Sequence, residues 1–268
     1  MALLALITML SLLAPLIVPY DPQRLFDPVA QRSQSASWAH VFGTDPLSRD
    51  VFSRVLIGAR VSLVLALATT CVSAIIGTMV GSVSGYVGGV VDRVSMRAVD
   101  VLLSIPRVLL LLTIVGVWGT PSLLMLVAVL AGTGWMSVAR VVRTEVRGWR
   151  SHDRVVAARS LGASHLDVLR RHILPEVWPI VAVMVTLGIG QVLLLESGLS
   201  FLGVGVQAPL ASWGTVLLDV SDVIGPARWL VLGPGLVLVC TVMALHRVGD
   251  AIHEWSGAPR FTPDDASR

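Results

Sequence analysis

The sequence predicts an all-α protein that crosses a membrane several times. Hydrophobic residues make up 54% of the 268 residues, only 14% are charged, and the mean hydropathy is +0.80. Soluble globular proteins carry about 25% charged residues, so lipid must be the solvent for most of this chain. Long apolar stretches recur along the chain, and arginines gather between two of them. We therefore expect a polytopic membrane protein with six transmembrane helices.

Each expected span is an apolar stretch close to the roughly 20 residues that a helix needs to cross a bilayer. Six stretches qualify, at residues 2–18, 61–83, 99–117, 122–142, 178–199 and 229–245. The first could instead be a secretory signal peptide, but it has no basic leading region and no A-x-A cleavage motif. We expect it to be retained as a helix.

The arginines predict the orientation. Eight lie in or beside the polar stretch between the fourth and fifth spans: Arg140, Arg143, Arg147, Arg150, Arg154, Arg159, Arg170 and Arg171. Membrane proteins collect such residues in cytoplasmic loops, so this stretch is expected to be cytoplasmic. Six spans then place both termini inside and residues 20–60 and 200–228 outside. The net charge of +3 is explained without a nucleic-acid partner.

Three parts follow along the chain. Residues 1–60 hold the first helix and an outer-face segment, residues 61–250 form the core transmembrane domain with a cytoplasmic loop at 151–178, and residues 251–268 form a cytoplasmic tail. Both cysteines, Cys71 and Cys240, lie inside apolar stretches, where free thiols usually pack as small hydrophobic groups.

Glycines repeat at four-residue spacing in the second expected span. Gly77, Gly81 and Gly85 lie on one helix face and leave it smooth. Small residues in this pattern allow two membrane helices to approach closely. We expect another helix to pack there, rather than a substrate path along that face.

The cytoplasmic loop is expected to contain two short helices with a break between them. Asp153 could cap the first helix, which Gly162 would end, and Ser164 with Asp167 resembles a capping box for the second. Such a loop could dock a partner protein, or its arginines could contact anionic lipid. Spacing alone leaves both interpretations open.

Charged residues near the membrane edges give weaker signals. Glu196 lies near the outer end of the fifth span and could belong to a path or gate, or could be an interfacial carboxylate that reaches water. Arg97 and Asp100 are three residues apart on one helix face and are expected to form a local pair.

Four separated motifs resemble one family. They are FGTDPLSRDVFSRVLIGARVSL (42–63), SGYVGGVVDRVSMRAVDVLLSIP (84–106), AARSLGASHLDVLRRHILPEVWP (157–179) and ESGLSFLGVGVQAPLASWGTVL (196–217). In this order they resemble ABC importer permeases of the oligopeptide, dipeptide and nickel class. The resemblance implies the type I ABC importer permease fold. It also implies that the third motif is the EAA loop, a coupling helix that enters a groove on an ATPase subunit.

The resemblance assigns the ATPase-coupling role to a set of loop residues: Ala157, Ala158, Gly162, Ala163, Leu166, Asp167, Ile173, Leu174 and Pro175. Two departures from the general pattern occur. Val156 stands where the glutamate that names the loop is expected, and the interval from Gly162 to Ile173 is one residue longer.

The resemblance also suggests an outer gate or pathway. Its residues would be Asp45, Arg49 and Asp50 in the first motif, and Glu196, Ser200 and Phe201 in the last. These positions imply gate architecture rather than substrate chemistry.

Partners follow from the same resemblance. The long outer segment after the first span resembles the C-type permease, which implies a heterodimer with a B-type permease, two ABC ATPase subunits and an extracytoplasmic binding protein. ATP and Mg would reside on the ATPases, because a chain without lysine cannot form a G-x-x-x-x-G-K-[ST] phosphate loop. Di- and oligopeptides are the expected cargo, with nickel, metal chelates, glutathione or other solutes as alternatives.

Other chemistries fit less well. A serine protease would need a base near Ser200, but the expected topology places His246 about 30 Å away across the hydrocarbon. His165 and His172 lie seven residues apart, and no second histidine completes H-E-x-x-H after His253, so no metal site or catalytic residue is expected. An ion-coupled carrier remains an alternative, although the sequence does not show the mid-depth carboxylates or broken helices that it would need.

Overall fold

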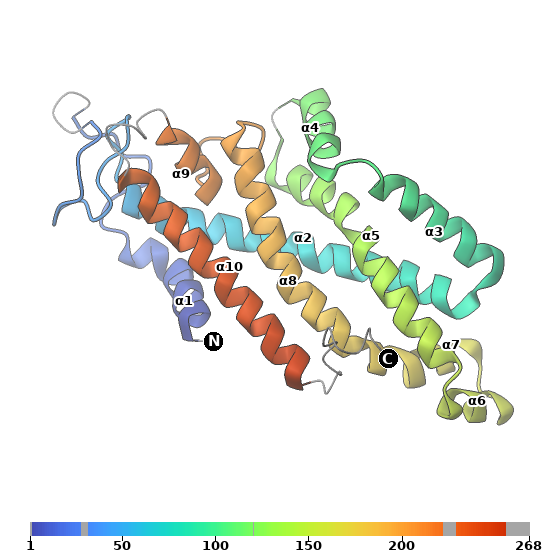
Figure 1. The fold of residues 1–268 in the computed structure, drawn as a ribbon. Helices are drawn as coiled ribbons and strands as arrows, with labels where there is room; N and C mark the ends of the chain where they lie inside the picture. Colours follow the sequence, from blue (N-terminus) through green and yellow to red (C-terminus); the bar gives the residue numbers. More distant parts are fainter. Residues whose placement is uncertain (1, 28–31, 120, 222–228, 256–268) are drawn as a thin grey trace, which may run out of the picture.

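The computed structural model describes residues 2–27, 32–119, 121–221 and 229–255, and within them it is helical without any strand of a sheet (Figure 1). The helices, in order, are α1 (Ala2–Ile17), α2 (Val51–Val87), α3 (Gly89–Leu103), α4 (Arg107–Trp118), α5 (Leu123–Arg150), α6 (Asp153–Ser160), α7 (His165–Val168), the π-helical segment η1 (Leu169–Ile173), α8 (Leu174–Phe201), α9 (Trp213–Asp219) and α10 (Trp229–Trp255). The prediction of an all-α fold is confirmed.

Among the described residues, four helical stretches are long and apolar enough to span a membrane. They are Val51–Val87, Leu123–Arg150, His165–Phe201, which joins α7, η1 and α8, and Trp229–Trp255. α3 and α4 pass the same test only as a pair, bent by 81°. The third predicted span is therefore wrong as a continuous helix. α1 is a shorter apolar helix, so the described helices establish a multi-pass protein but not the count of six.

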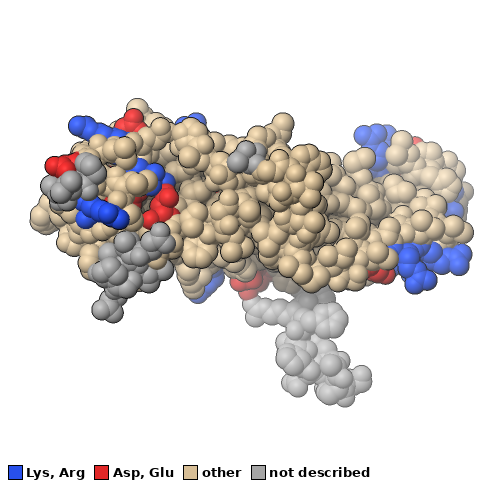
Figure 2. Space-filling model, turned by 90° about the horizontal axis from the view of Figure 1, so that it is seen from above, with Lys and Arg blue, Asp and Glu red and all other residues tan. Residues whose placement is uncertain are grey.

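Charges separate along the long axis of the molecule. Figure 2 shows that on the visible face Arg, Asp and Glu gather mainly at the two ends, with a largely uncharged region between them. One end holds the segment before α2 together with α9, and the other end holds α6 and α7 (Figure 1). Such a distribution suits a protein whose middle lies in hydrocarbon.

The predicted glycine face is a helix–helix contact. A Cβ built on Gly81 would lie 2.5 Å from the carbonyl oxygen of Ala139, and one on Gly85 would lie 2.6 Å from that of Arg143. Gly77 approaches Val138 in the same way. α2 and α5 therefore meet backbone to backbone, as small residues allow, and the expectation of close packing is confirmed.

Two local predictions are wrong. His152, and not Asp153, is the N-cap residue of α6, and Asp153 occupies its first turn, where a negative charge suits the helix dipole. Asp100 pairs with Arg140 of α5, at 2.5 Å, instead of with Arg97 on its own helix.

The predicted tail begins inside α10, which continues to Trp255, and its residues 256–268 lie outside the described part.

Candidate functional site

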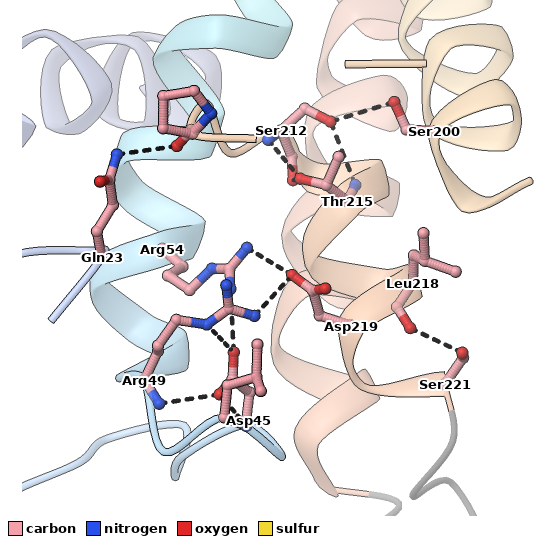
Figure 3. Close-up of polar contacts among 12 residues, drawn as sticks. Gln23, Asp45, Arg49, Arg54, Ser200, Ser212, Thr215, Leu218, Asp219 and Ser221 are labelled. Atoms are coloured by element: carbon pink, nitrogen blue, oxygen red, sulfur yellow. Dashed lines mark hydrogen bonds and ion pairs between the residues drawn. The ribbon is translucent and has the colours of Figure 1, made fainter. Parts of the chain in front are cut away.

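One end of the molecule holds the segment before α2 together with α9 (Figure 1), and we call it the outer end because the sequence predicts that it faces outward. It contains a network of four charged side chains (Figure 3). Asp45 accepts hydrogen bonds from Arg49 Nε at 2.7 Å and Arg54 Nη1 at 3.0 Å. Arg54 Nη2 also donates to Asp219 Oδ2 at 2.6 Å, and Arg49 Nη2 lies 3.0 Å from the same oxygen without hydrogen-bond geometry. Two cations and two anions alternate, so the network is electrically neutral.

The backbone around Asp45 holds that carboxylate in place. Its Oδ1 accepts the N–H groups of Leu47 and Arg49, each at 2.9 Å, and the side chain is 1% exposed. A carboxylate that accepts backbone N–H groups and faces two guanidinium groups is fully satisfied without water. Asp45 therefore fixes the outer segment onto the start of α2.

Asp50 has a different task from its predicted neighbours in the gate. It caps α2, accepting the Ser53 N–H at 2.7 Å, and its other oxygen lies 2.9 Å from His40 Nδ1. At 1% exposed it cannot present its charge to a solute. Asp45, Arg49 and Asp50 lie together at one end of the molecule. Their place on the outer side of the membrane and a direct contact of any of them with cargo stay predictions.

Arg54 and Asp219 complete this network and were missed by the sequence analysis. Arg54 lies in the first turn of α2, close to the predicted residues, and could have been included on that ground. Asp219 lies at the end of α9, 165 residues away in the chain. No local pattern could have paired it with Arg54.

A cavity of about 510 Å³ lies beside the network. Its walls come from the outer segment, the start of α2, the turn after α8, and α9, with Gln23, Arg49, Arg54, Gln207 and Asp219 as polar lining residues. Asp219 is the more open carboxylate of the network, with a side chain 31% exposed. The cavity is therefore polar on the side where the ion network forms its wall.

The ion network should hold α2 to α9 cooperatively. In a double-mutant cycle of Arg54→Gln and Asp219→Asn, we expect a coupling of about 1–2 kcal/mol in the free energy of unfolding, because the two side chains share one mostly buried contact. The exposed pair Arg140–Asp100, with side chains 50% and 59% exposed, is the matched control and should couple by about 0.5 kcal/mol or less. Additive effects at Arg54 and Asp219 in denaturant titrations would contradict this network.

Glu196 connects three elements just below the cavity. It is 1% exposed, and its two oxygens accept the hydroxyls of Ser200 at 2.7 Å and Ser62 at 3.2 Å. Those hydroxyls in turn accept the backbone N–H groups of Val206 at 3.0 Å and Trp213 at 3.2 Å. The carboxylate thus ties α8 to α2 and to the turn that leads into α9. The alternative of an interfacial carboxylate that reaches water is wrong.

The two residues predicted beside Glu196 differ in environment. Ser200 is buried and lines the cavity, and its hydroxyl also accepts that of Ser212 at 3.4 Å. Phe201 is 44% exposed at the end of α8. The chain therefore brings Glu196 and Ser200 together, but not Phe201.

A nucleophile–base pair at Ser200 is not formed. A Cβ built on Gly190 would lie 3.5 Å from His246 Cε1, so His246 lies beside a point ten residues before Ser200. Ten helical residues span about 15 Å, which is less than the predicted 30 Å but still far beyond hydrogen-bond reach. Within the described residues, no group of three His, Cys, Asp or Glu side chains could hold a metal ion.

The opposite end holds the folded loop, and we call it the inner end because the sequence predicts that it is cytoplasmic. Ser164 caps α7 by accepting the Asp167 N–H at 3.2 Å, as predicted, and Gly162 adopts a φ of +87°, a left-handed conformation that ends the preceding helix. η1 then leads into α8 without a break in the span His165–Phe201. The loop is thus continuous with a transmembrane helix.

The predicted coupling residues fall into two groups. Ile173 is fully buried, and Ala158, Ala163 and Leu174 are partly buried against the body of the protein. The exposed members form the outer surface of the loop: Ala157, Gly162, Leu166, Asp167 and Pro175. Leu161, which the sequence analysis did not include, is 89% exposed at the tip, and Leu166 is 61% exposed. Apolar side chains at the tip suit contact with a protein.

Contacts with neighbouring helices fix the loop. Tyr86 Oη lies 3.0 Å from Nδ1 of His165, which connects the end of α2 to α7. Arg154 of α6 forms an ion pair of 3.2 Å with Glu176 of α8. Val155 and Val168 pack into the same core cluster as Val142 and Val146 of α5. The loop therefore has a defined position relative to the membrane helices.

One feature that would have favoured an ion-coupled carrier is present, because the 81° bend breaks the third predicted span. The sequence analysis missed this break. Glu196 is a buried carboxylate within a membrane helix, but it lies near the end of α8 and not at mid-depth. A broken helix alone is compatible with both a carrier and an importer permease.

Comparison with known proteins decides the family. Residues 77–258 match the model of the family described as binding-protein-dependent transport system inner membrane component. The chain is 37% identical over 252 residues to the nickel transport system permease protein NikC of Escherichia coli (strain K12), covering 94% of this chain and 90% of the relative. It is 32% identical over 253 residues to the dipeptide transport system permease protein DppC of Bacillus subtilis (strain 168), covering 94% of this chain and 78% of the relative.

A third relative has another cargo in its name. The chain is 36% identical over 249 residues to the glutathione transport system permease protein GsiD of Escherichia coli O1:K1 / APEC, covering 93% of this chain and 82% of the relative. Similarity of this extent covers most of the chain. The chain belongs to the inner-membrane permease components of binding-protein-dependent ABC importers, in the group that includes the peptide and nickel permeases.

Proposed function

We propose that this chain is the C-type permease subunit of an importer that carries di- or oligopeptides through a path formed with a B-type permease. Two ABC ATPase subunits, which hold ATP and Mg, would drive it, and an extracytoplasmic binding protein would deliver the cargo. The subunit itself would break no bond. Peptide cargo is supported by relatives named for dipeptide and for glutathione, itself a tripeptide, and a nickel or metal-chelate cargo is the alternative.

The proposed topology has six spans with both termini in the cytoplasm, and α1 is the short first span. Arginines beside α6 and α7 favour the cytoplasmic side for the loop. The outer cavity would then face the binding protein, with Asp45, Arg49 and Asp219 forming the rigid rim of the gate.

The observation that carries the coupling role is the folded loop with its apolar tip. Leu161 and Leu166 project from a loop that is packed against α5 and continuous with α8. A movement of an ATPase bound there would be passed to the spans as a rigid-body displacement, in the manner of alternating access. ATP binding and docking of the binding protein would then shift the populations of inward-open and outward-open states.

Co-purification of the ATPase subunits tests the proposal. We expect Leu161→Glu to abolish ATPase retention on the detergent-solubilised complex, because it places a charge on the apolar tip without removing a contact inside the chain. Val156→Glu is the matched control. It adds the same charge in the same loop at a 51% exposed position, where the family pattern carries glutamate, and it should retain the ATPases.

Each result has a defined meaning. Loss of the ATPases with Leu161→Glu, while the B-type permease stays bound, supports the coupling role. If the wild-type chain retains no ATPase, the importer proposal fails. If both variants bind equally well, the loop tip is not the contact. Separate measurements of the uptake of a labelled dipeptide and of Ni²⁺ by the reconstituted complex then distinguish the two cargo classes.

A further inference from the structure

The break between α3 and α4 lies deep within the membrane region. Residues Ser104 to Pro106 separate the two helices, and Arg107 begins α4. The Arg107 side chain reaches α5 at Leu130 and Thr133. Those residues lie seven and ten positions after the start of α5 at Leu123, which places them about 10–15 Å along that helix. A bilayer core is about 30 Å thick, so the break lies near mid-depth.

Two of the three guanidinium nitrogens of Arg107 have hydrogen-bond partners. Its Nε donates to Thr133 Oγ1 at 3.1 Å and its Nη2 donates to the Leu130 carbonyl at 2.9 Å. Gly134 makes room for it, since a Cβ there would lie 3.1 Å from Nη2. Within the described part of the chain, Nη1 has no hydrogen bond and no carboxylate pairs with the guanidinium. The positive charge therefore has no counter-charge among the described residues.

The backbone at the break also lacks partners. Pro106 is the N-cap residue of α4 and offers no side-chain hydrogen bond. Among the described residues, the N–H groups of Arg107, Val108 and Leu109 donate to no backbone acceptor outside the helix, and the intrahelical ladder cannot use them. Ile105 and Val108 are 43% and 44% exposed, so the surface of the break is open.

Lipid cannot satisfy such groups. Non-helical backbone at membrane depth is tolerated only where protein buries it or where it lines a water-filled cavity. An arginine at mid-depth without a carboxylate also needs protein or water around it, because an isolated cation in hydrocarbon has a high free energy. Water or a partner subunit must therefore meet the break, and an arginine with one free edge and no carboxylate among the described residues favours water.

We infer that the α3–α4 break lines the aqueous translocation path, and that Arg107 is a cargo-contacting residue of that path, with its free Nη1 directed to the carboxylate of a passing solute. The inference rests on the proposed function and names the residue by which the path would favour carboxylate-bearing cargo. The two contacts to α5 serve to hold the guanidinium in one position, which leaves one edge of it for the solute.

Thiol accessibility in the assembled complex tests the inference. Cys71 and Cys240 are first replaced by alanine, and Ile105→Cys is introduced two residues before Arg107. The complex is reconstituted in vesicles and treated with two water-soluble methanethiosulfonate reagents of opposite charge, one sulfonate and one trimethylammonium. Val239→Cys, 50% exposed and ten residues into α10, is the matched control on a face expected to meet lipid.

We expect both reagents to modify the thiol at position 105 and neither to modify the one at 239. The anionic reagent should react faster than the cationic one. Arg107→Gln should lower the ratio of the anionic to the cationic reaction rate by about tenfold, because a positive charge roughly 6 Å away in water attracts one reagent and repels the other. Because Arg107→Gln keeps a hydrogen-bonding head group, it should leave assembly of the complex unchanged.

Contrary results are separable. An unmodified thiol at 105 in a complex that retains its ATPases overturns the inference and leaves the proposed function intact. Modification at 105 with an unchanged charge ratio in Arg107→Gln overturns the role of the arginine in attracting anions. Absence of the ATPases from the same preparation overturns the proposed function instead.

Discussion

Gly81→Ala is expected to destabilise the protein by about 2 kcal/mol, because even one methyl group would force α2 and α5 apart. The added Cβ would lie 2.5 Å from the Ala139 carbonyl oxygen and 2.9 Å from Val142 Cβ. Overpacking of a tight contact typically costs about 1–3 kcal/mol. The free energy of unfolding, measured by titration from mild detergent into SDS, is the test.

Gly132→Ala provides the matched control for this prediction. Gly132 lies in α5, is exposed, and would meet no atom within 4 Å if it carried a Cβ. The same chemical change should there be neutral or slightly stabilising, since alanine favours a helix more than glycine does. Equal stabilities of the two variants would show that the backbone contact between α2 and α5 does not form.

Glu196→Leu is expected to destabilise the protein by about 2–4 kcal/mol. The Ser62 and Ser200 hydroxyls donate to this carboxylate, and leucine would leave both without an acceptor in a buried place. Each unsatisfied buried donor costs about 1–3 kcal/mol. Glu196→Gln keeps the size and one acceptor oxygen, so it should cost less than half as much in the same SDS titration.

A further readout separates the hydrogen bonds from simple loss of packing. The Ser200 hydroxyl connects Glu196 to the N–H of Val206 in the outer turn. In Glu196→Leu, amide hydrogen exchange at Val206 should rise, whereas exchange at the inner loop should stay unchanged. A uniform rise along α8 would contradict a local role for Glu196.

Some of this architecture follows from the sequence because it depends on local patterns. Apolar stretches predicted where most membrane helices lie, the glycine spacing predicted the α2 face that packs closely, and Ser164 predicted its own cap. These features need only hydropathy and helical periodicity. Both can be read from neighbouring residues.

Other features depend on the direction that the chain takes between helices, or on contacts between residues far apart in the sequence. Residues 99–117 are one apolar stretch by hydropathy, which carries no information on the direction of the chain. Pro106 disfavours a helical conformation of the residue before it, and α3 and α4 meet there at an angle of 81°. Asp219 meets Arg54 only because α9 folds back over the start of α2. Glu196 lies near the end of its helix, as predicted, but its burial comes from the turn before Trp213, which helical periodicity does not predict.

The unbroken stretch from His165 to Phe201 gives the two ends of the molecule a mechanical relation. At 1.5 Å per residue its 37 residues measure about 55 Å, so a tilt of roughly 5° about one end displaces the other by about 5 Å. Leu166 lies near one end of this rod and Ser200, in the wall of the outer cavity, near the other. A small torque applied at the loop end of this rod therefore becomes a movement of atomic dimensions at its other end, with no intermediate joint required to relay it.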